Sequence, residues 1–314
     1  MGARANLFAL DQGKGIGMIE FLNGAWHVVW HSFLETVNLL PFLFLTYLLM
    51  EFLEHKSGDI TQRLLRRSGK VGPLVGGALG VVPQCGFSAA ASGLYGGRLI
   101  TVGTLLAVYL STSDEMLPIM ISGGASVGFM LTVLACKLVI AVTAGFVVDG
   151  VLRLLTKEKP TEEPQIEELC QRDHCKCGDH FVMSAANHTV RTLLFIFLIS
   201  LALNGTVELI GEDTLAGWVL NRPFLGNLLA ALVGLIPNCA SSVILTELYL
   251  SNVISLGAMM SGLLVNAGVG LLVLFRNNRP VRNSLYIVGT LFLIGVVSGL
   301  LLDLTSLSAL IGSL

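Results

Sequence analysis

The sequence predicts an all-α, polytopic integral membrane protein, and three observations support this. Of the 314 residues, 54% are hydrophobic and only 13% are charged, whereas soluble domains carry roughly 25% charged residues. Apolar runs recur along the chain, for example at 131–148 and 285–302, and about 20 apolar residues cross the ~30 Å hydrocarbon core of a bilayer. Two further apolar stretches share one Pro-polar-Cys interruption. Together these features predict about ten membrane segments.

Six of the apolar stretches are long enough for full membrane spans. We expect these spans at about 27–54, 99–121, 125–150, 189–211, 253–275 and 284–305. The stretches 71–95 and 225–249 contain Pro83 and Pro237 near their middles. Since proline removes a backbone hydrogen bond and breaks a helix, each is predicted to be a re-entrant hairpin of two half-helices. Glycines spaced four residues apart, as at 72–80 and 295–299, predict close helix packing.

The flanking segments complete the predicted domain organisation. Residues 1–26 are expected to form an interfacial N-terminal segment, and residues 151–188 a cytoplasmic linker between membrane repeats 27–150 and 189–314. Basic residues concentrate at 56–70, 153–159 and 276–282. The positive-inside rule places all three groups in the cytoplasm only if both interrupted stretches are hairpins.

An internal duplication is the most informative pattern in the sequence. Residues 79–85 match residues 233–239 at an offset of 154, and the same offset pairs Ser88 with Ser242 and Gly103 with Gly257. On the hairpin topology the two halves start on opposite sides of the membrane. They are therefore predicted to be inverted repeats, each with three full spans and one hairpin. Inverted repeats with broken helices are typical of secondary transporters, whose substrate sites lie near the bilayer midplane.

The two breaks supply one group of candidate substrate-binding residues. Unwound backbone is tolerated at membrane depth only where protein or a wet cavity satisfies it. Half-helix N-termini favour anionic or oxygen-rich ligands, whereas thiols suit thiophilic metals or trivalent arsenic. The alternative is a simple kink with cysteine as a small core residue. The predicted residues at the breaks are Gln84, Cys85, Ser88, Asn238, Cys239, Ser241 and Ser242.

A polar run supplies the second group. It consists of Ser111, Thr112, Ser113, Asp114 and Glu115 inside an apolar stretch. Acids within the membrane indicate function, so Asp114 or Glu115 is expected to carry a coupling proton or to ligate a cation. The alternative is a surface loop between two short helices. The equivalent stretch of the second half keeps only Asn266 as a polar counterpart.

Other charged residues have more than one interpretation. Glu247 in the second hairpin is either another proton-coupling group or a residue at the interface near Asn252. Lys137 and Asp149 are expected to be snorkelling or paired. His27, His31 and Glu35 share one helix face, which is either a metal-capturing face or the polar side of a helix end.

The linker contains a cluster of thiols and imidazoles. Three cysteines and two histidines fall within eleven residues, a set that suits the tetrahedral N/S preference of zinc or a similar soft ion. A cytoplasmic site for capturing or sensing metal is one interpretation, and a disordered loop is the other. The candidate metal ligands are Cys170, His174, Cys175, Cys177 and His180.

The predicted segments, the duplicated Pro-polar-Cys breaks and the run 111–115 resemble the ten-span heavy-metal exporters. That family is related to arsenic-efflux permeases and is sometimes labelled as manganese transporters. The resemblance covers nearly the whole chain. It implies export of a metal or metalloid across the cell membrane, which would be the inner membrane of a bacterium. The ion itself stays open, since thiols favour arsenite or zinc whereas carboxylates and amides favour manganese.

The sequence as a whole predicts a proton-coupled secondary active transporter that is not an enzyme. Its partners would be a small ion, the lipid bilayer and, in one version, further copies of itself. A net charge of −2 without a basic stripe argues against nucleic-acid binding, and the chain contains no P-loop motif for an ATP motor. The alternatives are a channel for a small polar solute and a membrane thiol oxidoreductase that uses Cys85 and Cys239, although the chain has no C-x-x-C motif around them.

Overall fold

A computed structural model describes residues 71–82, 86–113, 116–155, 181–210, 223–278 and 281–305, together with separate helical residues between 26 and 48. Within these residues all regular structure is helical, which confirms the predicted all-α class. Three helical segments of this part of the chain are long and apolar enough to cross a membrane: Val127–Leu155, Leu256–Asn277 and Val281–Leu304.

The first half of the chain contains the helix Val71–Gly80, followed by α3 (Gly86–Gly96), α4 (Val102–Ser111), α5 (Met116–Ser122) and α6 (Val127–Leu155). The second half contains α8 (Phe181–Ile210), α10 (Pro223–Gly234), α11 (Cys239–Leu250), α12 (Leu256–Val265), α13 (Gly270–Asn277) and α14 (Val281–Leu304). Helix α8 begins before the predicted span at 189, and α6 extends beyond 150. The helical part of the chain therefore extends at both ends into the predicted linker.

The elements of the two halves correspond at the offset of 154 found in the sequence. Helix α4 maps onto α12 with the same bounds, and α5 and α6 start 154 residues before α13 and α14. The turns correspond too. Arg98 and Asn252 have positive φ angles of 58° and 57°, and both turns contain a backbone hydrogen bond of 2.8 Å, from Leu99 N to Leu94 O and from Val253 N to Leu248 O.

Two predicted spans are wrong in one respect, because each is broken near its middle. The stretch 99–121 consists of α4 and α5, and 253–275 consists of α12 and α13. At the first break Thr112 leaves helical geometry with ψ 130°. At the second, Asn266 Oδ1 accepts a hydrogen bond of 3.0 Å from Gly268 N, and Gly268 adopts a positive φ of 51°. Hydropathy did not reveal these breaks because apolar residues continue on both sides of them.

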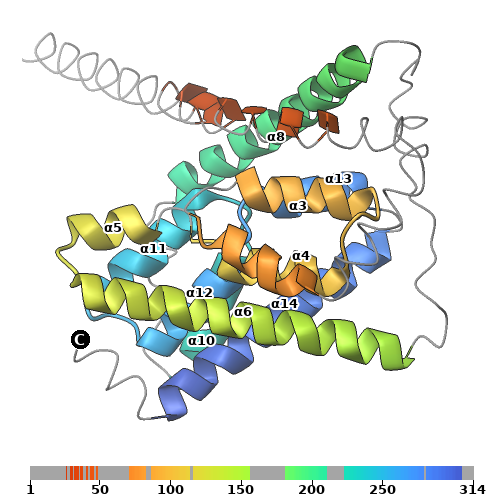
Figure 1. The fold of residues 1–314 in the computed structure, drawn as a ribbon. Coiled ribbons are helices and arrows are strands. Elements are labelled where there is room, and N and C mark those ends of the chain that lie inside the picture. Colours follow the sequence, from red (N-terminus) through yellow and green to blue (C-terminus); the bar gives the residue numbers. More distant parts are fainter. Residues whose placement is uncertain are drawn as a thin grey trace, which may run out of the picture.

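Contacts across the two halves hold the molecule together (Figure 1). Helix α4 packs along α6, and α12 packs along α14 and α10. Helix α3 of the first half lies beside α13 of the second, and α11 of the second half contacts α5 of the first. Because each short helix after a break packs on a helix of the other half, neither half closes its own core.

Buried apolar side chains form two clusters. The larger one includes residues of α4, α6, α10, α12 and α14. The smaller one joins the N-terminal helical residues Leu43 and Tyr47 to α8, with Ala89 of α3 and Val273 of α13. Helices α3 and α13 also contribute to the larger cluster, so this pair lies between the two.

Glycines allow the short central helices to approach their neighbours closely, as their spacing predicted. In the first half Gly72, Gly76 and Gly80 face residues of α4. In the second half Gly295 and Gly299 face α12. Since a Cβ atom at these positions would meet the backbone or side chains of the opposite helix, the small side chain is a packing requirement.

A carboxylate caps one central helix in each half. Asp149 Oδ1 accepts a hydrogen bond of 2.8 Å from Gly103 N, and Oδ2 accepts one of 2.7 Å from Thr101 Oγ1. The equivalent Asp303 accepts from Gly257 N and Ser255 Oγ at 2.9 and 2.8 Å. A negative charge at a helix N-terminus is favourable, so each carboxylate fastens a short helix to a long one. The partners of Asp149 in these hydrogen bonds are thus a helix N-terminus and a threonine hydroxyl, which are neutral groups.

We expect Gly103→Ala to destabilise the protein by about 1–3 kcal/mol, the usual cost of overpacking. A Cβ atom at Gly103 would collide with Gly145 O and with the carboxyl group of Asp149. Gly150→Ala is the matched control on α6, because nothing lies within 4 Å of its Cβ position, and alanine there should be neutral or stabilising. Thermal unfolding of the purified protein measures both, and equal melting temperatures for the two variants would contradict the packing argument.

Candidate functional site

The described part of the polar run, residues 111–113 at the end of α4, is buried inside the protein. Ser111, Thr112 and Ser113 are all buried. Their hydroxyl groups donate to backbone oxygens: Ser111 to Ala107 O at 2.8 Å, Thr112 to Val108 O at 2.8 Å, and Ser113 to Ser111 O at 3.0 Å. The alternative expectation is a surface loop between two short helices. The two short helices are present, but residues 111–113 are buried and do not lie at the surface.

The break before α11 is built by its own polar side chains. Asn238 is the N-cap of α11, and its Oδ1 accepts a hydrogen bond of 3.1 Å from Ala240 N. Ser241 Oγ donates to Asn238 O at 2.7 Å. Ser242 is buried one residue further along. These side chains satisfy Ala240 N and Asn238 O at the start of α11, so at least part of their polarity serves the turn itself.

A buried hydroxyl network joins the two halves, and the sequence interpretation did not include its main residues. Ser92 Oγ lies 2.6 Å from Tyr109 Oη and can donate its one proton to Ser88 O of its own helix at 2.6 Å or to Gly270 O at 2.7 Å. Tyr109 Oη donates to the same oxygen at 3.2 Å. Ser88, which was predicted, lies beside Gly270, where a Cβ atom would collide with it. The available signal was the i, i+4 pair Ser88 and Ser92 on one face of an otherwise apolar helix.

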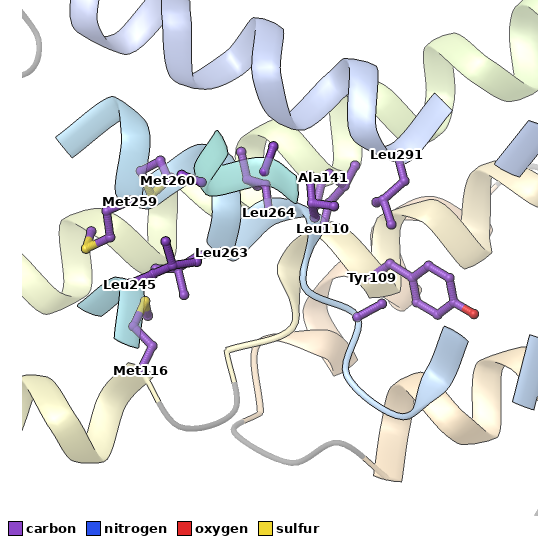
Figure 2. Close-up of a cluster of buried hydrophobic side chains, with 14 of the residues drawn as sticks. Tyr109, Leu110, Met116, Ala141, Leu245, Met259, Met260, Leu263, Leu264 and Leu291 are labelled. Carbon is purple, nitrogen blue, oxygen red and sulfur yellow. The ribbon is translucent and has the colours of Figure 1, made fainter. Parts of the chain in front are cut away.

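In the other half the counterparts of Ser88 and Ser92 are also buried hydroxyl residues, Ser242 and Thr246, whereas the counterparts of Tyr109 and Gly270 are apolar. The offset of 154 maps Tyr109 onto Leu263 and relates Gly270 to Met116. Figure 2 shows Leu263, Met116, Leu245 and Met259 gathered on one side, whereas Tyr109 lies apart with its hydroxyl pointing away from them. The duplicated backbone therefore carries a polar contact at one position and a hydrophobic one at its counterpart.

Lys137 of α6 is the charged residue at the centre of this arrangement. Its side chain is 0% exposed, so the snorkelling expectation is wrong. Its Nζ donates to Thr112 O at the break after α4, and to Leu263 O in α12 at 3.2 Å. The ammonium group thus contacts backbone from both halves. Its position in the long apolar span 125–150 gave a signal, but the sequence did not indicate its partners.

The remaining predicted residues are distributed as follows. Asn266 is buried at the break after α12, whereas Glu247 is exposed on α11. Gln84, Cys85, Asp114, Glu115 and the side chain of Cys239 lie outside the described residues, as do His27, His31, Glu35 and the loop residues Cys170, His174, Cys175, Cys177 and His180. Among the residues that are described, there is no group of three or more His, Cys, Asp or Glu side chains that would hold a metal.

Comparison with known proteins identifies the family. The model of a family described as "Putative, 10TM heavy-metal exporter" matches residues 27–218. The chain belongs to this family. The match agrees with the resemblance seen in the sequence, and with the apolar helices it supports a multi-pass protein of the cell membrane. Comparisons with curated proteins and with solved structures give no match.

We expect Tyr109→Phe to loosen the contact between α3, α4 and α13. The variant loses the hydroxyl shared with Ser92 and Gly270 O, at a cost of about 1 kcal/mol. Peptides covering α3 and α13 should exchange amide hydrogen faster than in the wild type. Tyr249→Phe is the control, because that half-buried ring stacks on Phe129 at a centroid distance of 5.6 Å. Equal exchange of α3 and α13 in both variants would contradict a bridging role for Tyr109.

Proposed function

We propose that this family member is a secondary active transporter that exports a metal or metalloid ion in exchange for protons. The observation that supports it most strongly is the duplicated set of broken helices, with buried polar residues at the breaks after α4, before α11 and after α12. Transporters built from repeats bind their cargo where discontinuous helices leave backbone groups inside the membrane. The family description supplies the class of cargo.

The two halves are proposed to be inverted repeats with a central site. Opposite orientation follows from the positive-inside argument and is compatible with the crossed packing of α3 on α13 and of α11 on α5. In this proposal substrate binds near Ser88, Asn238, Ser241 and Ser242, with Gln84, Cys85 and Cys239 as further ligands. Buried Ser111, Thr112, Ser113 and Asn266 line the region between.

Alternating access would use the two hydrophobic clusters as moving bodies. Each cluster is packed within itself, and the pair α3–α13 lies between them. The hydroxyl network at Gly270 O can be broken and remade at the cost of a few hydrogen bonds. Separating the side chains of either packed cluster would instead cost many van der Waals contacts between apolar groups. Since α3 and α13 contribute residues to both clusters, the movement in this proposal also repacks the residues of this pair.

Proton coupling is assigned to Asp114 or Glu115, with Glu247 as a less favoured candidate. Asp114 and Glu115 follow directly on the buried residues 111–113, and carboxylates at membrane depth are typical of proton-coupled carriers. Glu247 is exposed on α11, which is a poor position for controlled proton exchange unless the helix is covered in another state. The driving force would be the proton gradient, since one proton crossing one pH unit supplies about 1.4 kcal/mol.

Flux measurements in proteoliposomes test this function. With an acidic lumen we expect one ion of a panel of arsenite, manganese, zinc and an oxyanion to accumulate about tenfold per pH unit for each coupled proton. A protonophore should abolish this accumulation. Asp114→Asn or Glu115→Gln should remove accumulation while leaving downhill exchange of the ion, because only the coupling proton is lost.

The controls distinguish the classes of protein. Glu247→Gln should accumulate substrate as the wild type does. Flux that neither saturates nor responds to the pH gradient would identify a channel and overturn the carrier mechanism. If none of the ions in the panel moves, the metal or metalloid assignment fails.

A further inference from the structure

The surroundings of Lys137 are those of a cation-binding site. One acceptor, Thr112 O, belongs to the C-cap of α4, and the other, Leu263 O, lies in the last turn of α12. Helix C-termini carry partial negative charge, and backbone carbonyls that replace a hydration shell are the usual ligands of cations inside membranes. Two helix ends from different halves thus contribute oxygens to a single positive charge.

The other half shows that the fold does not require a charge at this position. The offset of 154 maps Lys137 of α6 onto Leu291 of α14, which is also fully buried. Leu291 belongs to the larger hydrophobic cluster, and Figure 2 shows it among the buried apolar side chains. The equivalent long helices therefore pack at this position with an apolar side chain in α14 and with an ammonium group in α6. The charge needs an explanation other than the packing of the helix.

We propose that the carbonyl oxygens around Lys137 form a monovalent-cation site at the junction of the two halves, whose resident ion is the chain's own ammonium group. Lys137 is a positioning residue: it holds the break after α4 against α12 without contacting the cargo. Its effect on transport rests on the proposed function, whereas the cation site itself does not. The site would accept a small monovalent cation with the size of an ammonium ion once the tethered one is removed.

Chemical rescue tests the site. Lys137→Ala leaves the carbonyl oxygens without their cation, and we expect the melting temperature of the purified protein to fall by about 5 °C. Methylammonium or potassium chloride should restore most of this loss, whereas choline chloride at the same ionic strength should not, because choline is too large for the vacated space. Leu291→Ala is the matched control, since it opens a similar space in the other half among apolar side chains and should gain nothing from methylammonium.

The outcome is decisive even if the variant folds poorly. In that case Lys137→Ala is purified in methylammonium and, separately, in choline, and recovery of folded protein in methylammonium alone supports the site. Failure of every small cation to raise either stability or recovery above the choline value overturns it. Equal rescue of Leu291→Ala by methylammonium would also overturn it, since the effect would then be unspecific.

A transport measurement separates this inference from the proposed function. Lys137→Leu copies the residue of the other half, so it should fold, and we expect its ion flux to fall at least tenfold with no rescue by methylammonium, because leucine fills the space. Wild-type flux in Lys137→Leu would overturn the positioning role. If the wild type moves no ion of the panel while methylammonium still stabilises Lys137→Ala, the proposed function fails and the cation site stands.

Discussion

Backbone polarity within the membrane is the constraint on which this structure depends. The described residues contain helix breaks at 81–82, 112–113, 235–238 and 266–269, and each break frees carbonyl and amide groups that lipid cannot satisfy. The structure satisfies them with short-range side chains such as Asn238 and Asn266, and with the ammonium group of Lys137, which comes from another helix. Because unsatisfied groups would be costly in hydrocarbon, polar residues at these breaks lie inside the protein, as Thr112, Ser113, Asn238 and Asn266 do. Burial of polar backbone at the centre is thus a consequence of breaking the helices at all.

The duplication gives both halves the same helices, turns and caps, whereas the side chains where the halves meet differ between the copies. The two halves share helix bounds, turns with positive φ and carboxylate caps at Asp149 and Asp303, with distances that differ by 0.1 Å at most, 2.8 against 2.9 Å and 2.7 against 2.8 Å. Where the halves meet, the correspondence ends. Lysine in one copy is leucine in the other, and tyrosine is leucine. A duplicated backbone therefore carries a lysine charge and a tyrosine hydroxyl in one half that the other half lacks.

Because helices of the two halves pack across one another, the two hydrophobic clusters do not coincide with the two repeats. Helices α3 and α13 come from different halves and lie together between two hydrophobic clusters. The carboxylate caps fasten α4 to α6 and α12 to α14, so these pairs are expected to move as units. The contact of Tyr109 and Ser92 with Gly270 O is polar and small by comparison. A rearrangement along that contact would break few hydrogen bonds, but it would also move Ala91 and Leu271, which belong to the larger cluster.

The sequence by itself determined the membrane class, the duplication, the proline breaks and the role of the closely spaced glycines, because composition, periodicity and self-similarity are local properties of the chain. It also marked Ser88, Ser111–Ser113 and Asn238 as polar residues of the interior. It did not reveal the breaks inside 99–121 and 253–275, since apolar residues hide a change of backbone direction. Only the tertiary structure decided that Lys137 contacts both halves, that Asp149 caps a helix, and that Ser92, Tyr109 and Gly270 meet. Each of these contacts joins residues far apart in the chain, and each includes a backbone atom, which every residue possesses and no pattern of side chains distinguishes.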